Sequence, residues 1–573
     1  WFELKDIRLF DLEGREALRL PRVLAAVSPR SVLLGQFEQL DIEQPELEIR
    51  RDANGHVWVA GIDTRAAGDG SGADWFFSQP EFLVRGGVVH WRDESRANAV
   101  QKNAPVLTLQ GVDVSMKNRW LSHDWRVDAT PPDAFGARLS LRAKLQHPFL
   151  SRAGDLSRWQ GELFTDLAQV NLASLRQWVA MDKGLSLQEG RGAVRLWSDV
   201  RQGLPVSVTA DVALDAVDAR LGSNLLPLRL RHVQGRIGAR WSDGEVEISS
   251  QDLVFDTQEG ERWPGGVLRV SWVGDGFESG ALHADRLDLE ALNQISQRMP
   301  LSESVRALLS RVQPQGQVNQ LKLTWQKNNG SFNYNARGQV RALSMLHDTQ
   351  ADSPFVNLPG LQGAQLDFDV SHQGGKAKVG IAKGSVTLPL GLDEPRIPLD
   401  EASAQLAWQI KGADVAVQFT QVHLLNEDVT GEFNGNWKTG EAQARLPGVL
   451  DLTAVISRAN AAQVHRYLPN TLSAQVRAYV RDAVLGGEAS HATLRLRGNL
   501  NDMPFDNPKQ GEFRIATQVA EARYAYVPPA TAKAKTSVTT GWPALTELNG
   551  ELVFERRALH FKGRTKLAGA PDV

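Results

Sequence analysis

Hydrophobic and polar residues alternate with a period of two along most of this chain. In one such run, Ile237, Ala239 and Trp241 alternate with Arg236 and Arg240. Successive side chains of a β-strand point to opposite faces, so the pattern predicts a strand with one apolar and one polar face. Later runs repeat it, with apolar positions at Leu366, Phe368, Leu406, Trp408, Leu494 and Leu496 and polar positions at Asp367, Asp369, Arg495 and Arg497.

Turn sequences separate these runs. Asn54-Gly55, Asp243-Gly244 and Lys411-Gly412 each lie between two alternating segments. Such dipeptides favour the tight turns of β-hairpins, because glycine and asparagine tolerate a positive φ. The sequence therefore predicts a mainly β fold, built as an antiparallel sheet with one apolar face throughout.

Short helical segments interrupt the strands. Asp288 can cap a segment in which Leu289, Leu292 and Ile295 lie at helical spacing, and a second helix is expected from Ser302 to Val312. The same design is expected to recur twice. A second copy begins at Asp451, with Leu452, Val455 and Ile456, and ends in a helix from about Ser473 to Leu485; a shorter copy runs from Asn171 through Leu172, Leu175 and Val179.

These recurrences divide the chain into four segments of one continuous array. We expect an N-terminal β-groove segment at 1–170, a repeat with a short helical insert at 171–287, and repeats with a helical pair at 288–450 and 451–573. Irregular spacing of the inserts is typical of an elongated array whose parts contact only their neighbours.

The apolar face of such a wide sheet can be buried in three ways. A sandwich covers it with a second sheet, a closed barrel encloses it, and a curled half-pipe leaves it lining a groove that needs an apolar occupant. The pattern of residues is compatible with all three.

Composition narrows the function classes. The 573 residues carry a formal net charge of -3, so binding of nucleic acid through a global positive charge is excluded. With 0 Cys there are no disulfides, thiolate nucleophiles or Cys-type metal sites. No apolar run approaches the roughly 18 residues of a membrane-spanning helix. The chain begins at Trp1, so we expect a fragment whose membrane anchor lies outside this sequence.

Motifs for chemistry are missing from the sequence. It contains no HExxH, GxxxxGK[ST] or GxSxG pattern, and its 12 histidines are scattered. We therefore expect a protein that is not an enzyme and that uses no cofactor and no metal.

Three segments carry a resemblance to a known family. Residues 37–62, with the sequence FEQLDIEQPELEIRRDANGHVWVAGI, resemble the early repeat of the AsmA-like proteins. Residues 75–94 (WFFSQPEFLVRGGVVHWRDE) and 282–325 (LHADRLDLEALNQISQRMPLSESVRALLSRVQPQGQVNQLKLTW) resemble its large YhdP branch. The resemblance extends over essentially the whole chain and rests on patterned segments.

The resemblance implies a function in lipid transport. It implies a periplasmic protein of Gram-negative bacteria, anchored in the inner membrane, whose repeating β-groove carries phospholipid towards the outer membrane and supports the outer-membrane barrier. The plan is similar to that of eukaryotic bridge-like lipid transfer proteins. The family offers no catalytic residues to carry over, and its N-terminal transmembrane helix is not in this sequence.

We therefore expect a monomer whose partners are phospholipid acyl chains, the inner membrane through that anchor, and the outer membrane, with no nucleic acid. The expected groove lining is Ile237, Ala239, Trp241, Leu366, Phe368, Leu406, Trp408, Leu494 and Leu496. A different class of function stays open: a periplasmic β-rich scaffold or assembly protein that contacts outer-membrane proteins by strand addition and has a closed sandwich or barrel.

Overall fold

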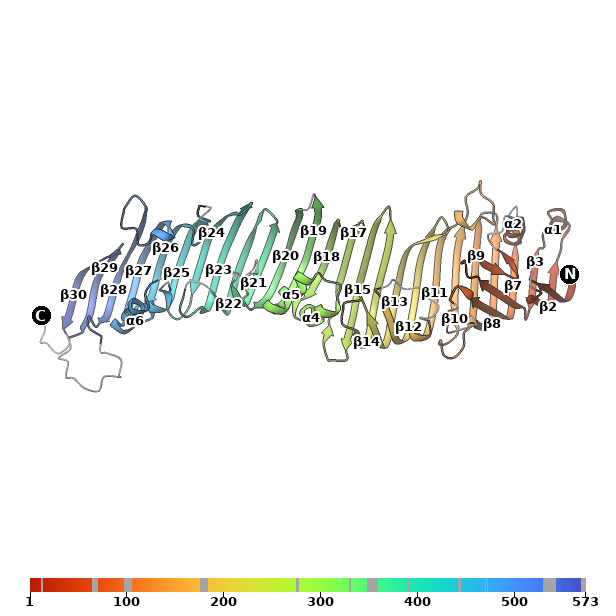
Figure 1. Cartoon of the computed structure of the whole chain (residues 1–573), viewed down its shortest axis with the longest axis horizontal. Coiled ribbons are helices and arrows are strands. Elements are labelled where there is room, and N and C mark those ends of the chain that lie inside the picture. Colours follow the sequence, from red (N-terminus) through yellow and green to blue (C-terminus); the bar gives the residue numbers. More distant parts are fainter. Residues whose placement is uncertain are drawn as a thin grey trace. The chain divides into compact units, whose positions relative to one another are not determined.

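The computed structural model describes most of the chain and places it in two compact units. The described residues are 1–11, 14–63, 71–96, 106–175, 184–274, 278–328, 331–347, 359–388, 392–441, 445–468, 470, 472–528 and 543–567. The first unit is Trp1–Phe277 with Gln297–Pro300, and the second is Glu278–Ser296 with Leu301–Val573. The prediction of a mainly β fold is confirmed (Figure 1).

The strands of the first unit are numbered β1 to β17. They are β1 Phe2–Phe10, β2 Glu16–Ala26, β3 Gln39–Glu43, β4 Glu46–Arg51, β5 Val57–Val59, β6 Ile62–Asp63, β7 Glu81–Asp93, β8 Val106–Arg119, β9 Ser122–Thr130, β10 Leu139–Gln146, β11 Gln160–Asn171, β12 Ser186–Arg201, β13 Leu204–Arg220, β14 Leu228–Ser242, β15 Glu245–Thr257, β16 Arg262–Trp263 and β17 Val267–Val273.

The strands of the second unit follow as β18 to β30. They are β18 Ser279–Asp288, β19 Gln315–Asn328, β20 Ser331–Met345, β21 Gly360–Ser371, β22 Gly374–Thr387, β23 Arg396–Lys411, β24 Asp414–Leu425, β25 Val429–Lys438, β26 Val449–Asn460, β27 Val484–Asn499, β28 Gly511–Tyr524, β29 Leu545–Glu555 and β30 Ala558–Leu567.

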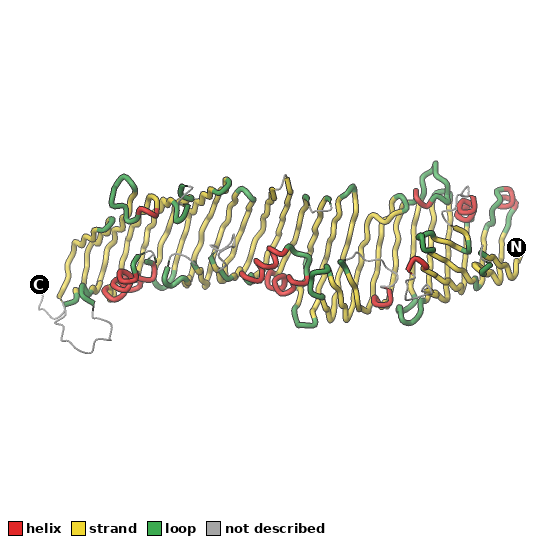
Figure 2. Tube along the Cα trace, viewed as in Figure 1, coloured by secondary structure: helices red, strands yellow, loops and turns green. Residues whose placement is uncertain are grey.

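Helices are few, short and located at the ends of strands (Figure 2). The α-helices are α1 Pro29–Leu33, α2 Ser71–Ser78, α3 Leu172–Leu175, α4 Leu289–Ile295, α5 Glu303–Val312 and α6 Ala474–Ala483; the 3₁₀ helices are η1 Glu94–Arg96, η2 Leu156–Arg158, η3 Ser296–Arg298, η4 Ala461–Tyr467 and η5 Leu500–Asp502.

Neighbouring strands pair in sequence order through most of each unit. In the second unit, each strand from β18 to β29 is antiparallel to the next one along the chain. The first unit has an exception, because β7 runs parallel to both β3 and β4. The expectation of a mostly antiparallel sheet is therefore confirmed.

Each unit is a single layer of strands. Among the described residues, strands make extensive contacts only with strands to which they are hydrogen-bonded. No pairing between described strands joins the first strand of either unit to its last. Within each described unit, this arrangement is neither a sandwich nor a closed barrel.

A line of β-bulges crosses the sheet of the second unit. Residues there adopt a positive φ next to register shifts: Gln320 in β19, Ala342 in β20, Gly363 in β21, Lys383 in β22, Gln421 in β24, His491 in β27, Glu521 in β28 and Glu547 in β29. A bulge inserts an extra residue, bends its strand and increases the local twist. Bulges on successive strands therefore bend the sheet repeatedly along one line.

The bulges also shift the alternation by one residue without changing the apolar face. In β20, Val340 pairs with Leu366 on one side of the bulge and Leu343 pairs with Ala364 on the other, although 340 and 343 differ by an odd number. Val340, Leu343 and Ala364 are buried together in one core cluster. The extra residue at the bulge turns the chain so that both sets of side chains face the same way.

The helical pairs form largely as the sequence predicts. Asp288 accepts a hydrogen bond from the backbone N–H of Ala291 at 2.9 Å, and the hydroxyl of Ser302 accepts one from Val305 at 3.4 Å. Ser473 caps α6 in the same way through the N–H of Val476 at 3.3 Å. Of the helix expected from Asn171 to Val179, α3 covers Leu172–Leu175, and Val179 lies outside the described residues.

The helix expected from Asp451 is wrong. Residues 449–460 form strand β26, where Leu452 pairs with Gly435 and Leu496. The segment also fits a period of two, and pairing on both edges of the strand outweighs the helical spacing of Val455. The helical insert begins later, at η4, where the side chain of Asn460 caps the first turn. Helix α6 ends at Ala483, two residues earlier than expected, because β27 begins at Val484.

An aromatic cluster holds α2 against the apolar side of the first unit's sheet. The Phe77 ring stacks on Trp125 with centroids 5.8 Å apart and meets Trp159 edge-on at 5.0 Å. Trp159 is buried and stacks on the His123 ring at 4.1 Å. Offset and edge-on contacts of this kind add to the burial of the rings, so they fix the position of α2.

His123 is a neutral member of this cluster. Its Nδ1 lies 2.7 Å from the carbonyl oxygen of the Asn118 side chain, and its Nε2 lies 3.0 Å from Nδ1 of His147. The carbonyl requires a hydrogen on Nδ1, which leaves Nε2 to accept from His147. Burial, together with the neighbouring His147, lowers the pKa of His123 from 6.5 to about 4.

We expect the free energy of unfolding to fall as the pH drops from 6.5 towards 5, a range in which most carboxylates are still ionised. The unfolded chain gains a proton on His123 as the pH falls below 6.5, whereas the folded chain gains it only near a pKa of about 4. Stability is therefore complete above pH 6.5 and lost progressively below it, by about 2 kcal/mol at pH 5. Urea unfolding at pH 7.5, 6 and 5 measures the loss. The variant His123→Gln should show a smaller slope with pH; an equal slope would contradict the assignment.

A second prediction concerns the bulge at Gly363. Its φ is +72° and a Cβ there would have its nearest contact 3.9 Å away, so the cost of a side chain is conformational. Gly363→Ala should lower the free energy of unfolding by about 1 kcal/mol, because L-residues disfavour this region. The matched control is Gly380→Ala in the neighbouring strand, where φ is ordinary and no atom lies within 4 Å. Urea midpoints should fall for the first variant only, and equal midpoints would refute the bulge argument.

Candidate functional site

The candidate site in the second unit is one face of the sheet, here called the apolar face. Residues directly opposite each other in antiparallel strands share a face, so the register traces rows of side chains across the strands. The first row runs from β18 to β27 through Leu282, Leu323, Ala336, Val370, Gly375, Trp408, Val417, Trp437, Leu450 and Gly498.

A second row runs beside the first, displaced from it by two residues in each strand. It extends from β20 to β28 through Gly338, Phe368, Ala377, Leu406, Phe419, Gly435, Leu452, Leu496 and Phe513. Every position in both rows is apolar or glycine. The two rows together make a continuous apolar surface with no polar interruption.

Large rings on this face lie across the glycines opposite them. A Cβ placed on Gly435 would come within 2.6 Å of the Phe419 ring, and one placed on Gly338 would lie 3.2 Å from the Phe368 ring. The glycines thus leave room for the rings to lie flat along the sheet. This packing keeps the apolar face smooth.

The first unit has a corresponding apolar surface on β13 to β17. Ala239 pairs with Val208 and Ile248, and Trp241 pairs with Val246, which in turn lies opposite Trp272. The side chains of Ile237 and Trp241 are 41% and 45% exposed. Large apolar side chains on this surface therefore lack a covering layer.

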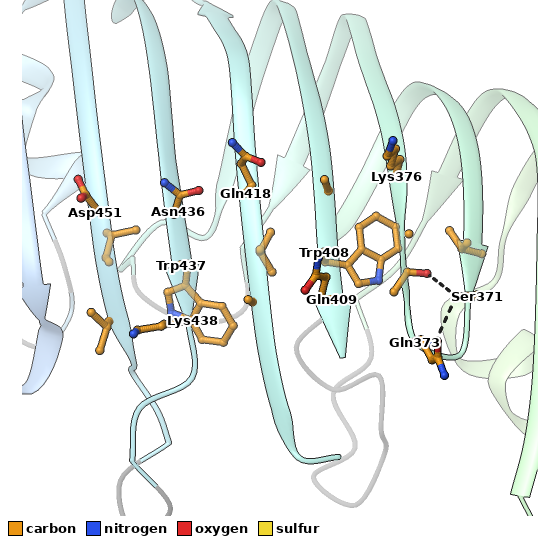
Figure 3. A pocket seen from close by; sticks show the side chains of 18 of the residues that line it. Ser371, Gln373, Lys376, Trp408, Gln409, Gln418, Asn436, Trp437, Lys438 and Asp451 are labelled. Carbon is orange, nitrogen blue, oxygen red and sulfur yellow. Dashed lines mark hydrogen bonds between the residues drawn. The ribbon is translucent and has the colours of Figure 1, made fainter. Parts of the chain in front are cut away.

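A hollow of about 920 Å³ lies along β20 to β27 (Figure 3). Trp408 and Trp437 flank β24, and the indole N–H of Trp437 donates to the carbonyl of Pro447 at 2.9 Å. The lining combines Trp408, Val417, Trp437 and Leu450 of the first row with Lys376, Gln418, Asn436 and Asp451 from the alternate positions.

The opposite, polar face carries ion pairs between neighbouring strands. Arg236 donates to both carboxylate oxygens of Asp211, at 2.6 and 2.9 Å, and this contact lowers the pKa of Asp211. Arg495 forms a similar pair with Asp451 and lowers the pKa of that carboxyl group. Charge on this face is therefore paired across strands, where it remains in contact with water.

The structure brings the residues expected in the groove onto common faces. Leu366, Phe368, Leu406, Trp408, Leu494 and Leu496 lie on the apolar face of the second unit, and Ile237, Ala239 and Trp241 lie on that of the first. Arg236, Arg240, Asp367, Asp369, Arg495 and Arg497 occupy the alternate positions. Their role in lipid binding stays a prediction.

Sequence reasoning missed part of this surface. Trp437 and Phe433 in β25 belong to it, and Leu452 was expected in a helix. The alternation of Phe433, Gly435 and Trp437 with Glu432 and Asn436 carries the pattern that identifies β25. Glycine in the middle position weakens the alternation.

Features of other kinds of site are absent from the described residues. No group of three or more His, Asp or Glu side chains in this part of the chain could hold a metal ion. In the same residues, no helix is long and apolar enough to cross a membrane.

Comparisons with known proteins agree with this architecture. The chain is 24% identical over 431 residues to the Escherichia coli (strain K12) protein named "Intermembrane phospholipid transporter YhdP", an alignment that covers 71% of this chain and 30% of that protein. The chain thus spans about a third of the length of this relative. No solved structure matches. The model of the family described as "YhdP protein" matches residues 2–570, so the chain belongs to the YhdP protein family.

Proposed function

We propose that the apolar face binds the acyl chains of phospholipids and carries them between the inner and outer membranes, in support of the outer-membrane barrier. The observation that carries the proposal is the unbroken first row, from Leu282 in β18 to Gly498 in β27, on a sheet that no other described strand covers. The name of the similar Escherichia coli protein, an intermembrane phospholipid transporter, supports it.

Binding follows from the hydrophobic effect. Each methylene removed from water contributes about 0.8 kcal/mol, so two acyl chains on this face are held strongly. Neighbouring side chains along the rows are all apolar, so an acyl chain can slide from one contact to the next without a large change in free energy. Headgroups stay in water at the edge of the sheet, and the movement itself is passive and needs neither a cofactor nor a metal.

The placement of the protein follows from the same proposal. A carrier between two membranes works in the periplasm, held at the inner membrane by an anchor outside this sequence and acting as a monomer. The alternative of a scaffold with a closed sandwich or barrel is not favoured, because the described strands of each unit form single layers with an uncovered apolar face.

A charge on the apolar face should block transport. Leu406 lies between Ala377 and Phe419 in the second row, and a carboxylate there has no partner and keeps water on the path. An unpaired charge in such a place costs several kcal/mol. We expect Leu406→Asp to reduce lipid transfer between donor and acceptor membranes at least tenfold.

The control for this variant lies one residue away. Gln405 points to the polar face and lies opposite Lys378, so Gln405→Asp places the same charge beside a cation. It should leave transfer unchanged. Equal loss in both variants, or normal transfer in Leu406→Asp with the fold intact by circular dichroism, would argue against the groove.

Photo-crosslinking should report the face directly. A photoreactive residue at position 406 or 494 should crosslink to phospholipid in cells, whereas one at 405 or 236 should not. The physical reason is that alternate residues of a strand face opposite sides of the sheet. Mass spectrometry of the adducts identifies the lipid, and equal crosslinking from both faces would overturn the assignment of the groove.

A further inference from the structure

Large apolar side chains protrude at one edge of the sheet in the first unit. Because β3 and β7 are parallel, α1 and α2, which precede them, lie at the same edge (Figure 1). The antiparallel pairs β7–β8, β8–β9 and β9–β10 place the β8–β9 turn and the loop 147–159 there too. We call the apolar side chains at this edge the tip patch: Leu33, Leu34, Trp75, Trp120, Phe149 and Leu150.

These side chains project from the protein and do not pack into it. Leu150 is 90% exposed, Leu33 is 87% exposed and Trp120 is 81% exposed. Isolated exposed leucines are ordinary on protein surfaces, but several large residues projecting from adjacent loops are not. The patch therefore indicates contact with an apolar medium.

Contacts between the loops make the patch continuous. The Trp75 indole N–H donates to the carbonyl of Gly35 at 3.1 Å, which joins α2 to the end of α1. The backbone N–H of Gly154 donates to Asp74 at 2.7 Å, which joins α2 to the loop 147–159. The Trp120 and Phe149 rings meet edge-on at 5.4 Å.

Arginines surround the apolar side chains. Arg152 pairs with Asp74 at 3.7 Å and Arg158 with Asp155 at 3.3 Å. Arg30 and Arg119 are exposed and have no carboxylate partner among the described residues. The edge therefore presents two unpaired arginines against one exposed carboxylate, that of Glu38, beside projecting leucines and aromatic rings, as in protein segments that lie in the interface of anionic lipid membranes.

The tip patch is also continuous with the apolar side of the sheet. The loop that carries Phe149 and Leu150 ends at Trp159, which is buried against Phe77 and Trp125. Helix α2 joins the two regions, because it contributes Trp75 to the patch and Phe77 to the cluster behind it. Apolar contact thus extends from the projecting tips to the face of the sheet.

We propose that the tip patch seats this edge of the protein in the headgroup region of an anionic phospholipid membrane, where lipid passes between the bilayer and the apolar face. The inference deepens the proposed function, on which it rests for the fate of the lipid. Projecting tips suit a bilayer, into which they can sink, whereas a protein partner usually requires a broad complementary surface of about 800 Å². The free arginines suit anionic headgroups.

Fluorescence can test the contact, because the chain has 0 Cys and a single introduced thiol is labelled uniquely. An environment-sensitive dye on Leu150→Cys should brighten at least twofold with vesicles of phosphatidylglycerol and phosphatidylethanolamine, and much less with phosphatidylcholine alone. The matched control is Val455→Cys, which is 58% exposed and lies on the polar face of β26 in the second unit, opposite Glu432 and Thr493. Its dye should not respond.

Co-flotation of the whole chain with the same vesicles gives the second measurement. The double variant Phe149→Ser, Leu150→Ser should bind at least fivefold less, while Val455→Ser on the polar face binds as the parent does. Equal binding of all three chains would overturn the inference, as would self-association of the parent that the double variant abolishes in sedimentation. Crosslinking of lipid at position 406 is measured in parallel. If the parent chain does not bind the vesicles but still crosslinks lipid at position 406, this inference is rejected and the proposed function stands.

Discussion

The hydrogen-bonded register between neighbouring strands is the constraint on which the rest of this structure depends. The described strands of each unit form a single layer, so apart from the places where a short helix such as α2 packs on the sheet, an apolar side chain is sheltered by the side chains beside it. Register decides which side chains those are. Where Leu406 lies between Ala377 and Phe419, a slip by one residue would place it among the polar side chains of the other face.

Bulges reconcile this constraint with bending. A strand that bends at one point must insert a residue there, and the insertion shifts the alternation downstream. The chain places the extra residue at corresponding points of successive strands, from Gln320 in β19 to Lys383 in β22, and the apolar positions shift with it. The buried cluster that contains Val340, Leu343 and Ala364 has members on both sides of this line.

The two faces divide the chemistry of the protein. Arginine and carboxylate side chains pair across strands on the polar face, as Arg236 and Asp211 do, and need no partner from outside. The apolar face has no such ion pairs among the described residues, and the proposed function assigns acyl chains to cover it. The ends of the strands differ from both faces. Helices and loops gather there, and in the first unit they combine projecting apolar side chains with Arg30 and Arg119, which have no carboxylate partner in the described part of the chain.

The sequence by itself determined the fold class, the antiparallel pairing and the division of residues between two faces, because alternation with a period of two has one simple structural meaning. It also determined the caps at Asp288, Ser302 and Ser473, which depend on local hydrogen bonds. Only the tertiary structure decided that Asp451 to Ile456 form a strand, because pairing with β25 and β27 outweighs local helical spacing. It alone decided that the sheet stays a single layer and that α2 packs on Trp125, since both depend on contacts between residues far apart in the chain.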